Sequence, residues 1–490
     1  MTDTNKNINI FALTDCHQEA RKLCALFSQI KENTFERGKN TLICDCGDLF
    51  KGIYDRQICV DSYLKLRSSL PEAKIVLALG NNDFGFNQEG LNFLINTASV
   101  FNKANIHVLC ANLFEDGSNK RPKWVDPYIL LEINGRKFMV MSFCINYIKL
   151  QKFKLKLSDI AETFAGLTET IKHISPDALI VLNHSTYDSS LKISELAEKA
   201  GINIDLIIGG HEHSPIEPNA EKHIYYPQAF SKNMLKFIYN TGEKNVKYSA
   251  EFLSKGIKLA AEYSAEIEEY EKKSGLNIEV AKSTINLEKR YSDPCSLGTF
   301  IADQMKAAAK TDIGMISTGY TSHALRFEKG KILTYYNLER ALSATVSLQT
   351  VVLHIGDLRD IFNNALRNRY IQKSGNTRFL QCSQNVSIVC AKNLQNWGSV
   401  RQIYINGNPL LDINFEPLNK DETYTCAIDP FVASGELGFD VLRKMPKETI
   451  MQNNELVRIK DLFVKAISEA PNKYPEGYEY PQFKLIDEGI

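Results

Sequence analysis

The sequence lacks the features that direct a protein to a membrane or to nucleic acid. Its 58 basic and 58 acidic side chains cancel, so there is no charge excess to bind a polyanion or an anionic surface. No apolar run approaches the roughly 20 residues that cross a bilayer. Residues 1–7 are polar, without the apolar core of a signal peptide. We therefore expect a cytoplasmic protein whose partners include no membrane and no nucleic acid duplex.

The cysteines also lack a pattern. There are 11 of them, an odd number, and no CxxC pair occurs. A disulfide framework would show regular spacing, so the simplest interpretation is a set of reduced thiols in an intracellular compartment. Internal repeats and low-complexity tracts are absent too. The 490 residues instead suggest roughly two to four globular domains.

The first half of the sequence does contain a regular alternation of short apolar runs and amphipathic stretches. The expected strands cover residues 7–13, 41–46, 74–79, 107–111, 178–182 and 206–208. The expected helices cover residues 19–32, 59–69, 89–97, 160–174 and 190–200. Asn134-Gly135 separates two further apolar runs, which is a strong hairpin signal. The pattern predicts a layered α/β domain with its loops gathered at one edge of the sheet.

The composition changes after about residue 250. Residues 257–273 are rich in Ala, Glu, Lys and Tyr and contain no Gly or Pro, which is typical of a solvated helix between domains. We predict domains at residues 1–252 and 276–490, joined by a linker helix within 253–275. In the second domain we expect helices over 297–309 and 357–367 and strands over 312–316, 350–354 and 424–428.

The strongest local signal is Leu-Ile-Ile-Gly-Gly-His-Glu-His at residues 206–213. An apolar run ends at two glycines, which permit a tight turn, and two histidines follow. Loops at strand ends are where a scaffold usually displays chemical groups. Earlier strand ends carry similar polar groups, so the candidate metal ligands are Asp15, His17, Asp48, Asn81, His184, His211 and His213.

Each of these motifs has a plainer explanation when it is taken alone. Asp15 is a good helix N-cap, Asn81 tolerates a turn, and His184 fits a hydrogen-bonded histidine at a strand end. Their convergence at strand ends is what indicates a metal site. Carboxylate, amide and imidazole ligands together suit Mn²⁺, Zn²⁺, Fe or Co²⁺, and a carboxylate can bridge two metals about 3.5–4 Å apart. We therefore expect two divalent metal ions.

Five blocks in order resemble those of the calcineurin-like metallophosphoesterases: Asp15-Cys16-His17, Gly47-Asp48, Gly80-Asn81-Asn82-Asp83, Asn183-His184 and Gly210-His211-Glu212-His213. Cys110-Ala111-Asn112-Leu113 is similar to an internal stretch of the 5′-nucleotidase / 2′,3′-cyclic phosphodiesterase branch. Residues 296–303, 312–319 and 431–439 are similar to blocks of its C-terminal domain. The resemblance implies a four-layer αββα metallophosphoesterase domain followed by a 5′-nucleotidase-like C-terminal α/β domain that binds the substrate.

The resemblance also implies a role for each ligand. One metal would be held by Asp15, His17, Asp48 and His213, and the other by Asp48, Asn81, His184 and His211. Asp48 would bridge them, and a hydroxide between the metals would attack phosphorus. The family uses a His–Asp dyad to assist the leaving group, but this sequence has Asn82 and Gly85 at those positions. Since an Asn side chain cannot give up a proton, we expect poor leaving groups to suffer most.

The nucleoside pocket that the resemblance implies is altered as well. Phe431 matches one of two base-stacking rings, and Thr345 lies where the other is expected. Ser317 replaces an Asn, and Ser322 replaces a phosphate-binding Arg. Ser cannot reproduce the bidentate contact of an Arg, although Arg326 lies close enough in sequence to compensate. A core phenylalanine explains Phe431 as well as base stacking does.

Together these observations predict an enzyme, a metallophosphoesterase that hydrolyses a small, nucleotide-like phosphate ester, with Asp48 and Asn82 at the reacting centre. Two alternatives stay open. The lost dyad and the lost arginine also fit a catalytically weakened nucleotide-binding or regulatory protein. Hydrolysis of a thiosulfate ester, which occurs in a related branch, would keep the metals and change the bond. The oligomeric state is not indicated by the sequence.

Overall fold

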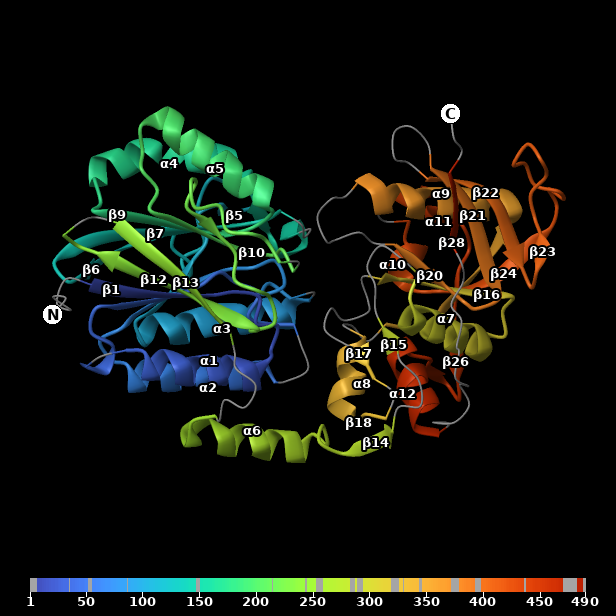
Figure 1. Ribbon diagram of the computed structural model, residues 1–490, viewed down its shortest axis with the longest axis horizontal. Helices are drawn as coiled ribbons and strands as arrows, with labels where there is room; N and C mark the ends of the chain where they lie inside the picture. The colour runs from blue at the N-terminus through green and yellow to red at the C-terminus, as the bar shows by residue number, and fades with distance from the viewer. Residues whose placement is uncertain are drawn as a thin grey trace. The chain divides into compact units, whose positions relative to one another are not determined.

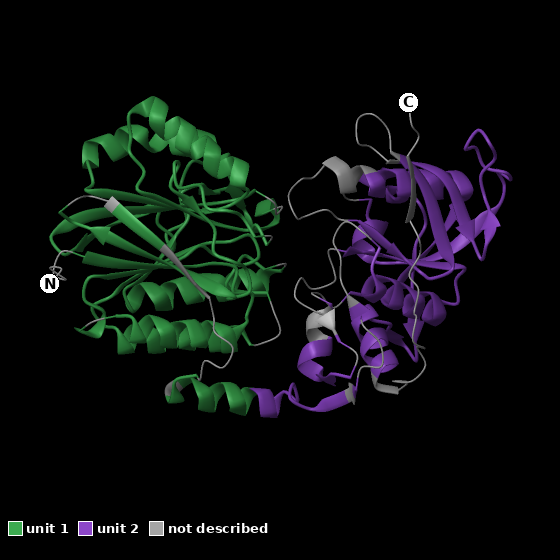
Figure 2. Ribbon diagram, viewed as in Figure 1, with its two compact units in different colours: residues 1–270 green, residues 271–490 purple. Residues whose placement is uncertain are grey.

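The computed structural model describes the chain except for residues 1–6, 35, 52–54, 86, 147–149, 214, 243–244, 253–258, 283–286, 289–293, 319–325, 329, 343–345, 372–378, 393–397, 436–437, 470–482 and 488–490. The chain divides into two compact units, residues 1–270 and 271–490 (Figure 2). Both units combine sheets with helices (Figure 1), which confirms the predicted mixed α/β fold class. Among the described residues, no helix has both the length and the apolar character that crossing a membrane requires.

The first unit is built on two sheets. The six-stranded sheet has the order β13-β12-β1-β2-β3-β4. Its strands are β1 (Asn7–Leu13), β2 (Thr41–Asp45), β3 (Lys74–Ala78), β4 (Ile106–Leu109), β12 (Asn233–Asn240) and β13 (Asn245–Phe252). The five-stranded sheet has the order β11-β10-β9-β7-β6. Its strands are β6 (Tyr128–Ile133), β7 (Arg136–Cys144), β9 (Ala178–His184), β10 (Leu206–Gly210) and β11 (Ile224–Tyr225). A ribbon of β5 (Leu113–Glu115) and β8 (Leu155–Leu157) lies beside them.

The apolar faces of these two sheets pack against each other and form a buried core. Ile10 and Leu42 come from the first sheet, and Val140 and Ile180 come from the second. Helices cover both outer faces (Figure 1): α1 (Ala20–Glu32), α2 (Arg56–Ser69) and α3 (Gln88–Lys103) on one, and α4 (Ile160–Ile174) and α5 (Tyr187–Ala200) on the other. This is the four-layer αββα order that the resemblance implied, and it agrees with the layered α/β domain that the sequence pattern predicted.

Polar caps explain where the helices of the first unit begin. Asp55, Asn87, Asp159 and Thr186 each accept a hydrogen bond from a backbone N–H in the first turn of α2, α3, α4 and α5. Such caps satisfy donors that have no partner inside the helix. Gly201 ends α5 in the left-handed conformation, with φ of 70°, which glycine adopts without a steric penalty.

The second unit also carries two sheets. The five-stranded sheet, in the order β20-β16-β24-β19-β25, contains β16 (Ile313–Ser317), β19 (Gln349–His354), β20 (Leu380–Cys382), β24 (Thr423–Ile428) and β25 (Glu448–Thr449). The four-stranded sheet, β23-β22-β21-β28, contains β21 (Val386–Lys392), β22 (Gly398–Ile405), β23 (Asn408–Pro409) and β28 (Phe483–Asp487). Short ribbons pair β14 (Glu279–Lys282) with β18 (Ile332–Thr334), β15 (Leu287–Glu288) with β17 (Arg326–Phe327), and β26 (Met451–Gln452) with β27 (Glu455–Leu456).

Helices fill the space around these sheets. They are α7 (Ser296–Ala309), α8 (Tyr335–Ala341), α9 (Ile355–Ile371), α10 (Pro430–Ala433), α11 (Asp440–Arg443) and α12 (Ile459–Glu469). One core joins α9 to both sheets, and a second joins α7 to α12, where the Phe300 and Phe463 rings meet edge to face at 5.9 Å. The helix α6 (Ala261–Lys273) crosses the division between the two units.

Candidate metal centre

The seven candidate ligands all lie at the carboxyl ends of strands in the first unit. Asp15 and His17 follow β1, Asp48 follows β2, and Asn81 follows β3, all in the six-stranded sheet. His211 and His213 follow β10 of the five-stranded sheet. His184 departs slightly from the expectation, because it is the last residue of β9 and not a loop residue. Since parallel strands present their carboxyl ends at one edge, the two packed sheets bring these side chains to one place.

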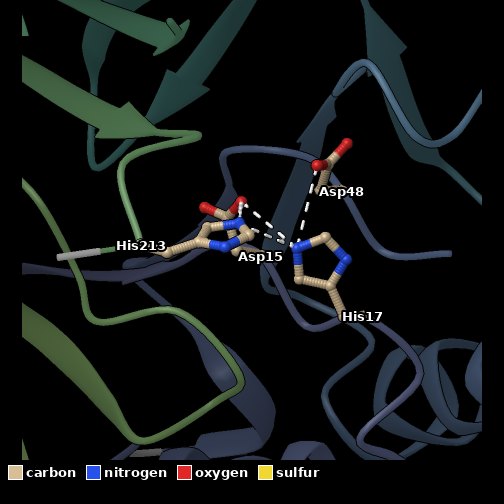
Figure 3. Close-up of side chains that lie close together, drawn as sticks. All are labelled: Asp15, His17, Asp48 and His213. Carbon is tan, nitrogen blue, oxygen red and sulfur yellow. Dashed lines mark hydrogen bonds and ion pairs between the residues drawn. The ribbon is translucent and has the colours of Figure 1, made fainter. Parts of the chain in front are cut away.

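Four of the seven side chains form a compact cluster, drawn in Figure 3. One potential ligand atom from each of Asp15, His17, Asp48 and His213 lies within 4.8 Å of those of the others. The Nε2 atoms of His17 and His213 are 3.1 Å apart. Asp15 Oδ1 lies 3.2 Å from His213 Nε2 and 3.6 Å from His17 Nε2, and Asp48 Oδ2 lies 3.8 Å from His17 Nε2. This group can hold a metal ion.

The other three side chains lie next to this cluster. His184 Nε2 is 3.3 Å from Asp48 Oδ2, and the His184 and His211 rings meet edge to face at 5.5 Å. His211 Nδ1 forms a 2.8 Å hydrogen bond with Asn81 Oδ1. The backbone N–H of His211 donates to Asp15 Oδ2 at 2.9 Å, which ties the second group to the first.

The backbone of the ligand loops is unusual. Asp15, His17, Asp48 and His211 all have positive φ, between 47° and 74°. Non-glycine residues adopt this region rarely, and such strain concentrates at functional sites. Backbone hydrogen bonds between the β1 and β2 loops hold it in place, from Asp15 N–H to the Gly47 carbonyl at 2.8 Å and from His17 N–H to the Asp48 carbonyl at 2.9 Å.

Glycine is required where these loops approach one another. A Cβ at Gly80 would lie 2.2 Å from Asp48 Oδ1 and 2.3 Å from Asp48 N. A Cβ at Gly210 would lie 2.4 Å from Thr14 Oγ1 and 2.8 Å from His184 Nδ1. Both contacts are shorter than atoms tolerate, so the two glycines let the ligand loops pack together.

A buried carboxylate and a carbonyl orient the ligands from behind. Asp83 accepts hydrogen bonds from the N–H groups of Asp48 at 3.0 Å, Phe50 at 3.0 Å and Gly80 at 2.8 Å. Burial and the neighbouring Asp48 raise the pKa of Asp83 to about 7. The Cys46 carbonyl lies 2.7 Å from His184 Nδ1, which aims Nε2 at Asp48. Partners of this kind fix metal ligands in one orientation.

The two clustered carboxylates stay ionised although both are fully buried. Burial raises the pKa of Asp15, but His184, His17 and His213 outweigh it and hold that pKa well below its usual range. Burial likewise raises the pKa of Asp48, and His184 and His17 lower it by more. The charged form of a carboxylate is the form that binds metal.

The histidines differ in charge. Burial and the adjacent His184 lower the pKa of His211 to about 4, and burial lowers the pKa of His213. Both rings are therefore neutral near neutral pH, as metal ligands must be. Burial also acts to lower the pKa of His184, but Asp48 and Asp15 overcome it and raise that pKa to about 10. A metal ion would have to displace this proton.

The donor set fits a divalent metal. His184 Nε2 is buried and makes no hydrogen bond within the described parts of the chain, although it points at the carboxylate of Asp48. A buried nitrogen without a hydrogen bond is costly, and a metal ion would satisfy it. Imidazole nitrogens mixed with carboxylate and amide oxygens are the ligands that Mn²⁺, Fe, Co²⁺ and Zn²⁺ accept.

Asn82 and Gly85 stand where the resemblance placed a catalytic dyad. The backbone N–H of Asn82 donates to Asp48 Oδ1 at 2.7 Å, and its side-chain Nδ2 donates to Asp48 Oδ2 at 2.5 Å. Gly85 has φ of 68°, and a Cβ there would lie 2.9 Å from the Gly90 Cα. Asn82 therefore contacts the Asp48 carboxylate, and its part in the reaction stays a prediction, whereas packing leaves no space for a side chain at Gly85.

Two of the four predicted substrate-binding residues are brought together in the second unit. Ser317 is the buried last residue of β16, and Phe431 in α10 is partly buried against the core. Asp429 joins them by accepting N–H bonds from Ser317 at 2.8 Å and from Phe431 and Val432 at 3.0 Å. Arg326 belongs to β17, paired with Glu288. Thr345 lies outside the described residues.

Two residues that contact these sites, Asp429 and Phe230, were not expected from the sequence. Asp429-Pro430 is a recognisable helix start, because Asp caps and Pro favours the first helical position. Phe230 contacts two of the ligand histidines, but no local pattern marks it. Its place depends on the path of the chain between β11 and β12.

Comparison with known proteins identifies two matching families. A model of the calcineurin-like phosphoesterase family matches residues 8–215. A model of the 5′-nucleotidase C-terminal domain matches residues 275–444. These two segments carry the predicted metal ligands and the three described residues that are predicted to bind the substrate, Ser317, Arg326 and Phe431.

One relative and two solved structures illustrate the likeness. An apyrase of Aedes albopictus is 24% identical over 493 residues, which cover 90% of this chain and 83% of that protein. The structure of a 5′-nucleotidase precursor from Thermus thermophilus has a TM-score of 0.73 at 17% identity, covering 99% of this chain and 100% of that one. The sulfate thiohydrolase SoxB from Thermus thermophilus also has a TM-score of 0.73, at 14% identity, covering 98% and 97%. At these identities the structural likeness shows the fold alone.

Proposed function

Because the chain belongs to the calcineurin-like phosphoesterases and carries a 5′-nucleotidase C-terminal domain, we propose that it hydrolyses a nucleotide-like phosphate ester with two divalent metal ions. The family is one of metal-dependent hydrolases, and the chain is a metallophosphoesterase. The number of metals and the substrate are our proposal. The name of the similar apyrase and the 5′-nucleotidase domain support a nucleotide-like substrate.

The observation that carries this proposal is the cluster of Asp15, His17, Asp48 and His213 within 4.8 Å. These four would hold one metal. Asp48, Asn81, His184 and His211 would hold the second, with Asp48 shared. The Asp48 carboxylate lies near both groups, with Oδ2 3.8 Å from His17 Nε2 and 3.3 Å from His184 Nε2.

When bound, the metals would activate a water as the nucleophile and withdraw charge from the phosphoryl oxygens. In such a hydrolysis the water oxygen would form a bond to phosphorus as the bond from phosphorus to the leaving oxygen breaks. The protein's task is to orient the ligands before this happens. Asn82 clamps Asp48 through two hydrogen bonds, and the Cys46 carbonyl fixes the His184 ring. Preorganised groups of this kind need no rearrangement during the reaction.

The leaving oxygen has no acid at position 82, because the Asn82 side chain donates hydrogen bonds but does not release a proton. General acid catalysis contributes typically about 10²–10⁴-fold. We therefore propose that good leaving groups, such as a phenolate or the phosphate of a polyphosphate, react faster than a ribose alkoxide. That ranking favours a nucleoside polyphosphate or an activated ester over a nucleoside monophosphate.

The test is a metal-dependent screen of the full chain. It compares p-nitrophenyl phosphate, bis(p-nitrophenyl) phosphate and a nucleoside mono-, di- and triphosphate, each with Mn²⁺, Co²⁺, Zn²⁺ or Fe²⁺ and with a chelator. Asp48→Asn is the control, since it removes the shared carboxylate charge without changing the side-chain shape. Turnover that needs metal and disappears in Asp48→Asn supports the proposal. Tight nucleotide binding without turnover of any ester would favour a regulatory protein instead.

A further inference from the structure

We infer that Phe230 is a positioning residue for the metal centre: its ring fixes the imidazoles of His17 and His213 in the orientation that binds metal. This inference rests on the proposed function. Phe230 belongs to none of the five sequence blocks and offers no atom that could bind a metal. Its influence therefore has to pass through the two histidines that it contacts.

The three rings form a closed group. The Phe230 ring centroid lies 5.2 Å from that of His17 and 5.2 Å from that of His213. The two imidazole centroids are 4.9 Å apart, with their planes at 80°. Phe230 has only 8% of its surface exposed. Because each ring is in contact with the other two, rotation of either imidazole would change its contact with the Phe230 ring.

The backbone at Phe230 is held in an uncommon conformation. Phe230 has φ of 64°, and the next residue, Ser231, has φ of 49°. A positive φ is rare for a bulky side chain and persists only where the surroundings enforce it. The Phe230 N–H donates to the Asp15 carbonyl at 2.7 Å, and Lys22 Nζ donates to the Phe230 carbonyl at 3.5 Å. The first of these partners is itself a proposed metal ligand.

The chain path explains how a residue so far along the sequence reaches the site. β11 lies in the five-stranded sheet, and β12 pairs with β1 in the six-stranded sheet, so residues 226–232 cross from one sheet to the other. They cross next to the carboxyl end of β1, where Asp15 accepts the Phe230 N–H. The crossing places an apolar ring against His17 of one sheet and His213 of the other.

The orientation of these two rings decides whether the site can bind. His17 Nε2 and His213 Nε2 face each other at 3.1 Å, and both face Asp15 Oδ1. Outer partners that orient ligands usually do so through hydrogen bonds, and their loss typically weakens metal affinity about 10–100-fold. A phenyl ring forms no such hydrogen bond, so Phe230 would orient the two histidines by packing against them. Lys232 Nζ lies 5.9 Å from the ring centroid, within the range of a cation–π contact that would help hold it.

The experiment compares Phe230→Leu with Phe230→Tyr in the full chain. Leucine keeps an apolar side chain of similar bulk but removes the ring, whereas tyrosine keeps the ring. We expect Phe230→Leu to bind Mn²⁺ about tenfold more weakly, measured as free Mn²⁺ by electron paramagnetic resonance, at the lower end of the usual range for orienting partners. The visible absorption of the Co²⁺-loaded protein should also change, because it reports ligand geometry. Phe230→Tyr keeps the ring, so it should show the wild-type Mn²⁺ affinity and the wild-type Co²⁺ spectrum.

Phe164→Leu is the matched control. Phe164 is a fully buried ring in α4 of the same unit, and it packs with Phe143 in the core under α4 and α5 without a ring contact to a ligand histidine among the described residues. Phe164→Leu should lower the thermal stability of the protein without changing its Mn²⁺ affinity or its Co²⁺ spectrum. Wild-type affinity and an unchanged spectrum in Phe230→Leu would overturn the positioning role and leave the proposed function intact. A wild-type protein that does not bind Mn²⁺ would instead overturn the proposed function, and this inference with it.

Discussion

Asn82 donates hydrogen bonds to both carboxylate oxygens of Asp48, from its backbone N–H to Oδ1 at 2.7 Å and from its side chain to Oδ2 at 2.5 Å. The residue that stands where the resemblance places a general acid therefore contacts Asp48 directly. It holds the carboxylate that we propose is shared between two metals. Exchanging Asn82 changes two properties together, the supply of a proton and the orientation of Asp48.

We expect Asn82→His to raise kcat for alkyl monoesters, such as a nucleoside monophosphate, by about tenfold. This is below the usual 10²–10⁴-fold contribution of a general acid, because the histidine would lack its dyad partner and would loosen Asp48. The kcat for nitrophenyl esters should rise little, since the nitrophenolate leaving group needs no proton. The measurement is kcat for both substrate types at saturating Mn²⁺. A lower rate for monophosphates, with the metal still bound, would contradict this prediction.

Gly85 should resist restoration of the dyad. A Cβ at Gly85 would lie 2.9 Å from the Gly90 Cα, and φ there is 68°. We expect Gly85→Asp to destabilise the first unit by about 1–3 kcal/mol through overpacking, and the double variant with Asn82→His to be no more active than Asn82→His alone. Gly117→Asp is the control, because Gly117 has φ of 72° and no atom within 4 Å of an added Cβ. If Gly85→Asp and Gly117→Asp lowered Tm by the same amount, the loss of stability would come from the positive φ and not from packing against Gly90.

Gly80→Ala should abolish metal binding. The added methyl group would meet Asp48 Oδ1 at 2.2 Å and Asp48 N at 2.3 Å, so it must displace the proposed shared ligand. We expect a loss of turnover of at least about 10²-fold, by analogy with a 1 Å misplacement of a reacting group. Gly166→Ala is the control, since Gly166 lies in α4 with no atom near its Cβ, and it should be neutral or slightly stabilising. Mn²⁺ titration with normal affinity in Gly80→Ala would refute this prediction.

The sequence revealed the elements that are bounded by strong local signals. Residues 7–13 and 160–174 have the predicted limits as β1 and α4, because clear apolar periodicity ends at a turn or a cap. The strand ends that carry the ligands were also predictable. Antiparallel β12 and β13 and the four-stranded sheet of the second unit were not, because their pairing depends on distant partners. Strand propensity alone does not specify such pairing.

Within the site, the sequence indicated which side chains gather at the strand ends, but it did not indicate their geometry. An Asp or a His at a strand end carries no local sign that φ will be positive, as it is at Asp15 and His211. Loop-to-loop hydrogen bonds impose that conformation. The contact of Phe230 with His17 is also tertiary, because it depends on where the chain crosses between two sheets. Sequence periodicity does not contain this information.

Asp429→Ala should damage substrate binding more than chemistry. The Asp429 carboxylate accepts the N–H groups of Ser317, Phe431 and Val432. Its loss leaves buried donors without a partner, which we expect to destabilise the second unit by about 2 kcal/mol. KM for a nucleotide should rise, whereas kcat/KM for p-nitrophenyl phosphate should change little, because the metal ligands lie in the other unit. An equal loss of kcat/KM for the nucleotide and for p-nitrophenyl phosphate would contradict a substrate-binding role for the segment that contains Asp429 and Phe431.

Metal removal should destabilise the first unit by mass action. A ligand that binds only the folded state at about 100 times its Kd stabilises that state by about 2.7 kcal/mol. For a unit of this size, each kcal/mol moves Tm by roughly 2–4 °C, so Mn²⁺ should raise Tm by roughly 5–10 °C over a chelated sample. Asp48→Asn should show no such rise, since it removes the carboxylate that contacts both His17 and His184. Calorimetry with and without Mn²⁺ measures the shift. If Mn²⁺ raised the Tm of Asp48→Asn by as much as it raised that of the wild type, the metal would bind elsewhere on the chain.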